Sequence, residues 1–210
     1  MKISKPRIDA KLDDGSLDDL LEGEPEDVLL RDIDATNSHI TSLDMSGMVL
    51  EKALMTASHF ERLVVRDVRF DKCDLSAVAM NSGEINRAEF VNCRMTGVNL
   101  NKTTLHDITF RGCKLDMANF RFTNLRRVAF VDCTLAETDF LGATVHDVSF
   151  ESCTLERTIF TQTKCKSLDL RTSELIEISG WASLRGAVID STQLVAASPY
   201  LANELGIIVR

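Results

Sequence analysis

The chain has 210 residues, a formal net charge of −8, and only 3 prolines and 10 glycines. No stretch approaches the ~18 consecutive apolar residues of a membrane span, and the first fifteen residues are charged, without the apolar core of a secretory signal. We therefore expect no membrane association and, by default, a cytoplasmic location.

The negative charge is concentrated at the start of the chain. Residues 1–30 carry 9 acidic and 4 basic side chains, a net of −5, whereas residues 56–180 carry 17 acidic and 16 basic side chains, a net of −1. Binding to nucleic acid through the phosphate backbone needs a basic surface. The distribution argues against nucleic acid as a ligand.

Residues 1–37 are predicted to form an N-terminal arm and cap. Ser16 is a good N-cap for a short helix in SLDDLLEGE, with Asp18 and Asp19 near its positive end. Pro25 then ends or redirects the helix. Residues 28–37 follow the later repeat only imperfectly and are expected to lead into the first coil.

The middle of the chain has an apolar residue at every fifth position. From Ile40 to Leu175 all 28 such positions are apolar, and nine of the ten phenylalanines occupy them, with Phe122 the exception. Most residues two positions earlier are small. Neither a 3.6-residue nor a 2-residue period produces this pattern. It predicts five-residue segments, each with two inward side chains and a turn.

Like residues also recur at a spacing of twenty. Cysteine stands at 73, 93, 113, 133 and 153, and phenylalanine at 70, 90, 110, 130 and 150. Four pentads per coil would stack these residues on one another, with about 4.8 Å between coils. Seven such coils would form a rod roughly 34 Å long.

The pentads CDLSA, VNLNK, CKLDM, ANFRF, TNLRR and TDFLG resemble the A(D/N)LXX pattern of the pentapeptide-repeat family. The resemblance covers residues 38–195 and implies an all-β solenoid, a right-handed quadrilateral β-helix. With no linker elsewhere in the chain, we expect one domain over residues 1–210.

The repeat slips by one residue within IEISGWASL, where apolar residues resume at Leu184 and Ile189. We expect Trp181 to cover this irregular coil. Residues 196–210 are predicted to be a helical cap. One short helix would start at Ser191 or Thr192, and another would start at Ser198–Pro199 and end at Gly206.

The tail is more apolar than an end cap requires. We predict a two-fold homodimer through this tail. The residues expected at its interface are Leu194, Tyr200, Leu201, Leu205, Ile207 and Ile208.

The five-cysteine column has two interpretations. Cysteines twenty residues apart form a line rather than the tetrahedral cluster of a zinc site, and parallel side chains 4.8 Å apart do not suit a disulfide. A packing role for small buried thiols is favoured over a metal or redox role. Five unpaired thiols also favour a reducing compartment.

Four histidines, His39, His59, His106 and His146, are predicted to lie on the surface. His106 and His146 would share a column with Arg126 between them, too far apart to share a metal ion. With no long insertion loop to build a cleft, we expect no catalytic, metal or cofactor site and no enzyme activity.

Three outward sets of side chains remain. Asp67, Arg87, Asp107, Arg127 and Asp147 alternate in sign and predict ion pairs along the rod, while Asn86, His106, Arg126, His146 and Lys166 form a mildly basic column. An acidic patch is the candidate partner-binding surface, although a solvated face is the simpler explanation. It comprises Asp116, Asp132, Glu137, Asp139, Glu151 and Glu156.

The favoured function is a non-catalytic binding rod. Regular cysteine and phenylalanine columns and a C-terminal helical cap are similar to the quinolone-resistance branch of the family. That resemblance implies a dimeric DNA mimic that binds a type II topoisomerase, DNA gyrase or topoisomerase IV. The nearly neutral coils argue against this function, and the alternative is a scaffold for another protein partner.

Overall fold

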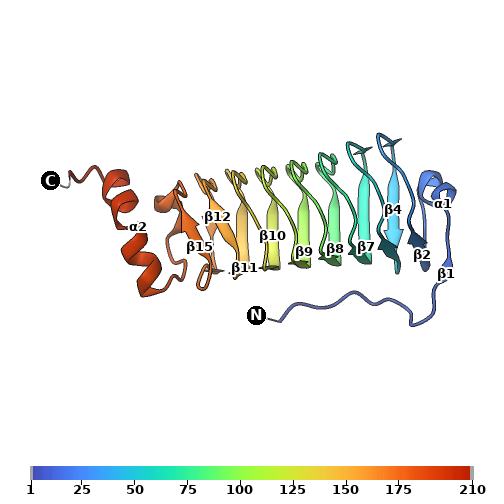
Figure 1. Cartoon of the computed structure of the whole chain (residues 1–210), viewed down its shortest axis with the longest axis horizontal. Helices are drawn as coiled ribbons and strands as arrows, with labels where there is room; N and C mark the ends of the chain where they lie inside the picture. Colours follow the sequence, from blue (N-terminus) through green and yellow to red (C-terminus); the bar gives the residue numbers. More distant parts are fainter. Residues whose placement is uncertain (1, 209–210) are drawn as a thin grey trace.

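The structure is a computed structural model, and it describes residues 2–208. The chain winds into a β-solenoid whose coils stack side by side along one axis (Figure 1). Helix α1 lies at one end of the rod and helix α2 at the other. The N-terminal segment runs back along one side of the coils.

Short parallel strands form the coils. The elements of the N-terminal half are β1 (Asp13–Asp14), α1 (Leu17–Glu22), β2 (Val28–Arg31), β3 (His39–Ile40), β4 (Leu43–Ser46), β5 (Val49–Glu51), β6 (His59–Phe60), β7 (Leu63–Asp71) and β8 (Glu84–Val91). Those that follow are β9 (Thr104–Arg111), β10 (Asn124–Val131), β11 (Thr144–Glu151), β12 (Thr154–Glu156), β13 (Lys164–Cys165), β14 (Leu168–Asp169), β15 (Glu174–Ile176), a 3-10 helix (Trp181–Leu184) and α2 (Ser191–Glu204).

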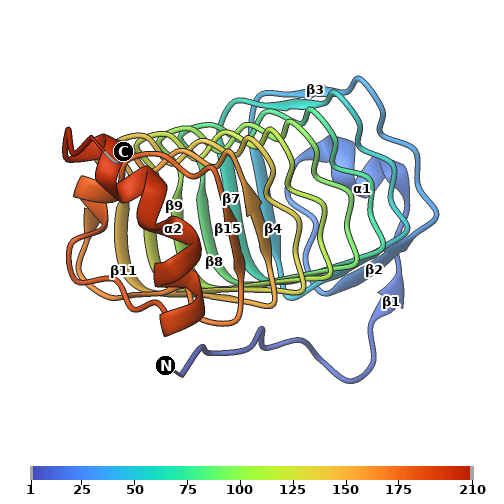
Figure 2. The same ribbon diagram turned by 60° about the vertical axis from the view of Figure 1, so that its left-hand side comes forward.

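The register between coils is twenty residues, as predicted. Phe130 pairs with Phe110 on one side and Phe150 on the other, and β7, β8, β9, β10 and β11 are successive neighbours in the main sheet. The backbone N–H and C=O groups of each coil bond to the coils above and below it. Figure 2 shows the resulting stack at an angle.

Most of the turns are made by residues in the left-handed conformation, two positions after a large apolar residue. Met117 has a φ of 58° and Phe122 a φ of 57°. This conformation is higher in free energy for a non-glycine residue, so contacts with the surrounding structure must stabilise it. The next coil does so, because Met117 N donates to Ala136 O over 2.7 Å and Phe122 N to Leu141 O over 2.9 Å.

Phenylalanine rings fill the interior of the middle coils. The ring of Phe130 stacks between those of Phe110 and Phe150, with centroids 4.9 and 4.6 Å away. It also forms edge-to-face contacts with the rings of Phe120 and Phe140, whose centroids lie 5.9 and 6.3 Å away. The predicted five-residue pattern therefore produces one continuous aromatic core.

The small residues of each pentad do more than fill space. Thr123 Oγ1 donates to Leu100 O over 3.0 Å, and the thiol of Cys113 donates to Phe90 O over 3.3 Å. Both bonds join residues 23 positions apart. Hydroxyl and thiol groups at this position thus satisfy buried carbonyls of the preceding coil, which explains why polar threonine is tolerated inside.

The N-terminal cap has the predicted helix, and coil stacking starts early. Ser16 and Asp19 form a capping box at the start of α1. The parallel ladder already includes Leu30, which pairs with Leu50, and Asp34, which pairs with Leu54. Residues 28–37, the segment expected to lead into the first coil, therefore already belong to it.

The predicted one-residue deletion is confirmed near the other end. Ile159 pairs with Ser179, twenty residues on, whereas Asp169 pairs with Val188, nineteen residues on. The 3-10 helix occupies the shortened segment, and Trp181 packs partly buried against the core.

The prediction of two C-terminal helices is wrong. Helix α2 is continuous from Ser191 to Glu204, starts at the N-cap Asp190, and contains Pro199. Proline lacks the N–H that would bond to Val195 O, but the hydroxyl of Ser198 donates to that carbonyl over 2.8 Å. Ser198 therefore compensates for the proline inside one helix instead of capping a second helix.

Candidate binding surfaces

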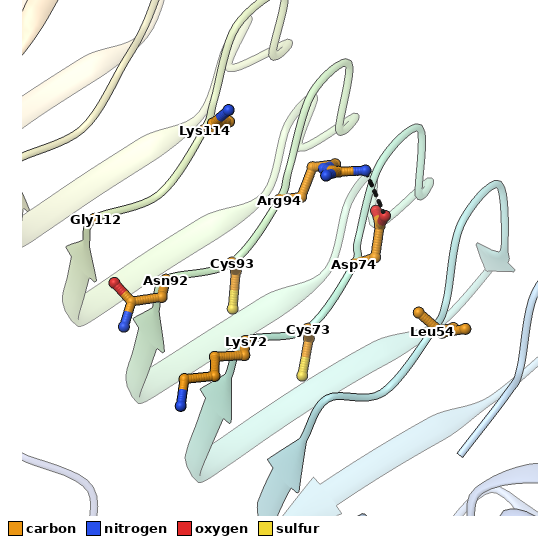
Figure 3. Close-up of a pocket in the computed structure, with 9 residues that line it drawn as sticks. All are labelled: Leu54, Lys72, Cys73, Asp74, Asn92, Cys93, Arg94, Gly112 and Lys114. Atoms are coloured by element: carbon orange, nitrogen blue, oxygen red, sulfur yellow. Dashed lines mark hydrogen bonds and ion pairs between the residues drawn. The ribbon is translucent and has the colours of Figure 1, made fainter. Parts of the chain in front are cut away.

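One shallow hollow opens beside the cysteine column (Figure 3). Its volume is about 330 Å³, and Cys73 and Cys93 lie against it. Around it stand Leu54, Lys72, Asp74, Asn92, Arg94, Gly112 and Lys114, with Arg94 paired to Asp74 at 3.4 Å. The hollow is open to solvent and offers charged rims instead of an enclosed substrate cavity.

The thiols of the column already serve as donors. Cys73 Sγ donates to Leu50 O over 3.4 Å and Cys93 Sγ to Phe70 O over 3.5 Å. All five column cysteines are buried. The geometry supports the packing interpretation. Cys165 lies off this column and is half-buried, and burial raises the pKa of its thiol.

The predicted acidic patch includes two carboxylates that stabilise turns. Asp116 accepts hydrogen bonds from Ala136 N at 2.9 Å and Thr134 Oγ1 at 3.1 Å. Asp139 accepts one from Leu141 N at 2.8 Å and lies 3.6 Å from the guanidinium of Arg121. These two groups are engaged within the rod.

The other four carboxylates of the patch separate into two pairs. Glu137 and Glu156 both contact Arg157, with Glu137 Oε1 2.9 Å from Arg157 Nη2. Asp132 and Glu151 lie at another turn of the coil, where Asp132 N donates to Glu151 O over 2.9 Å. Both are exposed, and within residues 2–208 neither has an ion pair. Only this second pair presents unneutralised negative charge.

The alternating column forms two close ion pairs. Arg87 lies 2.5 Å from Asp67, and Arg127 binds Asp107 through two bonds of 2.7 and 2.8 Å. Asp107 is only 3% exposed. The hydrogen bonds from Arg127 lower the pKa of this carboxyl to about 2. These pairs are better protected from solvent than the predicted surface ladder.

The protection comes from the N-terminal arm, which runs alongside the coils (Figure 1) and bonds to two aspartates of this column. Arg7 N donates to Asp67 Oδ1 over 2.9 Å, and Ser4 N donates to Asp107 Oδ1 over 3.2 Å. Three extended residues span about 10 Å, close to the ~9.6 Å between aspartates two coils apart. The arm and the coils therefore match in spacing, a relation that the sequence analysis missed.

The mildly basic column has the predicted register. His106, Arg126 and His146 pair in succession across β9, β10 and β11. Burial and the neighbouring Arg127 lower the pKa of His106. Arg126 and Lys166 are exposed, so they are the cationic members of this column that a partner can reach.

Helix α2 covers the last coil through a few polar contacts. Gln193 Nε2 donates to Leu170 O at 2.7 Å and to Ser173 O at 2.6 Å. The carboxylate of Glu204 accepts hydrogen bonds from the backbone N–H groups of Trp181 and Ala182. The helix is thus fixed on the rod by its inner face.

Its outer side and the residues after it are apolar and exposed. Leu194 is 52% exposed, Leu205 74% and Ile208 79%. Tyr200 and Ile207 are also exposed, and Leu201 is half-buried. Residues 194, 201 and 205 fall on one helical stripe. Five of the six predicted dimer residues therefore present free apolar surface.

Family comparison agrees with this architecture. A family model described as "Pentapeptide repeat region" matches residues 64–128 and 104–179. The chain belongs to the pentapeptide-repeat family. No curated protein matches its sequence. In the described part of this pentapeptide-repeat protein, no helix has the length and apolar character needed to cross a membrane.

The comparison with solved structures matches, among others, the following three proteins. A trypsin-treated variant of QnrB1, a plasmid-mediated fluoroquinolone resistance protein, shares 17% identity over 88% of this chain and 89% of its own, with a TM-score of 0.42. A protein from the Arabidopsis thaliana thylakoid lumen shares 18% over 44% of this chain and 65% of its own, with a TM-score of 0.42. HetL, involved in heterocyst differentiation regulation in Nostoc sp. strain PCC 7120, shares 13% identity over 79% of this chain and 89% of its own, with a TM-score of 0.38.

Proposed function

We propose that this protein is a non-catalytic rod that binds a protein partner through its outward side chains. The observation that supports this proposal is that different groups of each pentad have different roles. Two side chains pack the core, backbone groups bond to neighbouring coils, and only the outward side chains remain for recognition. Their spacing is fixed by the ladder, which favours recognition by a preorganised surface.

The exposed pair Asp132 and Glu151 is the part of the predicted acidic patch that best suits a cationic partner. A direct test is affinity capture from lysate with the purified rod and with an Asp132→Asn/Glu151→Gln variant. We expect a partner that binds the wild type and is lost with the variant. A Glu137→Gln control removes a carboxylate already paired with Arg157 and should retain the partner. Equal capture by all three proteins would remove this pair from the interface.

We also propose that α2 and the tail form a homodimer. Exposed Leu194, Leu205 and Ile208 support an apolar interface, and a two-fold arrangement would bury the stripe against its own copy. Light scattering at tens of micromolar should give twice the chain mass, and Leu194→Glu/Leu205→Glu should give a monomer. A monomeric wild type would contradict the proposal.

A DNA mimic that binds DNA gyrase or topoisomerase IV and protects against quinolones is the second candidate. The exposed, unpaired Asp132 and Glu151 favour it, since an acidic surface on a rod can occupy a basic DNA-binding saddle, whereas the net charge of only −1 over residues 56–180 does not. The paired carboxylates Glu137 and Glu156 count against it. Purified protein at micromolar concentration should alter gyrase supercoiling and fluoroquinolone poisoning. If neither assay changes, the topoisomerase function is ruled out and the scaffold for another protein partner remains as the proposed function.

A further inference from the structure

Two histidines and one glutamate gather on the surface of two adjacent coils near the N-terminal end of the rod. His39 and His59 are register partners in β3 and β6, and their imidazole rings stack with centroids 5.1 Å apart and planes 12° apart. Glu61 Oε1 lies 3.1 Å from His39 Nε2. One ligand atom from each of the three residues lies within 4.8 Å of the others.

The ladder places these side chains together. Ile40 and Phe60 point into the core, so the residues before them, His39 and His59, point outward on the same side. His59 N donates to Ser38 O over 2.9 Å and Glu61 N to Ile40 O over 3.1 Å. The backbone of the cluster is therefore rigid, while the side chains of His39 and Glu61 are 57% and 51% exposed and free to rotate.

From this arrangement we infer that His39, His59 and Glu61 bind a divalent transition-metal ion of the Zn²⁺ class. Two imidazole nitrogens and one carboxylate oxygen are a donor set that Zn²⁺ accepts in a four-coordinate site, with water as the fourth ligand. Hard ions such as Mg²⁺ prefer oxygen ligands and are not expected here. Small side-chain rotations bring the three atoms to bonding distance of one ion.

The proposed ion would join two coils near the N-terminal end of the rod. Its ligands come from both coils, so an ion that binds only the folded chain stabilises their stacking by mass action. Figure 2 shows β3 at the rim of the rod opposite the N-terminal arm, and His39 on this strand is exposed. This inference is independent of the partner-binding function proposed above.

The test uses the full chain after treatment with a chelator. Calorimetric titration with ZnCl₂ should show one ion per chain, and the thermal unfolding midpoint should rise with Zn²⁺ but not with Mg²⁺. His59→Gln should weaken Zn²⁺ binding by about tenfold or more and remove the thermal shift, and Glu61→Gln should weaken it as well. His146→Gln is the matched control, because it removes a half-buried surface histidine of β11 and should bind like the wild type.

Cys165 is the thiol that competes as a ligand, so all proteins are compared in a Cys165→Ser background as well. Co²⁺ should give a tetrahedral spectrum without a thiolate charge-transfer band. Circular dichroism establishes that each variant is folded. The inference is overturned by absence of binding at hundreds of micromolar Zn²⁺, by equal binding in folded His59→Gln, or by a thiolate band that disappears with Cys165→Ser.

Discussion

Truncation of one stacked ring tests the whole architecture. Phe130 is fully buried and touches four other rings, two face to face at 4.9 and 4.6 Å and two in edge contacts at 5.9 and 6.3 Å. Replacing a buried phenylalanine by alanine costs about 3–5 kcal/mol, and each lost aromatic pair adds about 0.5–1.5 kcal/mol to its burial. We expect Phe130→Ala to lower the free energy of unfolding by about 4–5 kcal/mol or more.

Phe122 provides the matched control. It is the one phenylalanine outside the five-residue pattern, it is 51% exposed, and its ring covers Gly142, where an added Cβ would lie 2.6 Å from the ring. Phe122→Ala should cost about 1 kcal/mol or less. Urea unfolding is followed by circular dichroism for the coils and by fluorescence of Trp181 for the C-terminal end. Similar losses in the two variants would refute the inward and outward assignment, and with it the register.

Three further outcomes follow from particular contacts. Arg127 lowers the pKa of Asp107 to about 2, so the ion pair contributes about 2 kcal/mol to the free energy of unfolding above pH 4. This contribution is lost as the pH falls through 2. Asp107→Asn should therefore lower the free energy of unfolding at pH 7 and lower it much less near pH 2. Asp107→Ala, which removes the acceptor of the Ser4 N–H, should speed tryptic cleavage after Arg7 because the arm loses one of its two anchors, and an unchanged rate would mean that other contacts hold the arm. Thr123→Val leaves the buried carbonyl of Leu100 without its donor and should lower the free energy of unfolding in urea by about 1–3 kcal/mol. Thr123→Ser keeps the hydroxyl and should retain most of the wild-type stability.

The coils could be predicted from the sequence because every coil repeats the same constraint. A large inward residue at each fifth position, with the Phe110–Phe130–Phe150 spacing of twenty, leaves one way to stack the chain. The deletion near Trp181 was also visible, because one missing residue shifts every later apolar position. Its structural counterpart is the nineteen-residue pairing of Asp169 with Val188.

The ends of the chain were harder because single contacts decide them. A Ser-Pro pair is a common helix start, and no periodic signal reveals that Ser198 binds Val195 O within a longer helix. The N-terminal arm has no repeat of its own, and its position depends on two backbone N–H groups that meet Asp67 and Asp107. The count of charges likewise placed six carboxylates in one acidic patch. In the structure they differ in their contacts, because Arg157 neutralises some of them and Asp116 accepts hydrogen bonds within a turn.

The cap continues the rod's own hydrogen-bond register, and this bears on how a partner or second copy would bind. Thr163 Oγ1 donates to Phe140 O, 23 residues earlier, and Gln193 Nε2 donates to Leu170 O at the same separation. The amide of Gln193 therefore takes the place that a threonine hydroxyl would occupy in one more coil. Because α2 is tied to the ladder in this way, an interface on its outer face would hold the rod at a fixed angle. Two rods joined through Leu194 and Leu205 would then present their outward columns as one rigid surface.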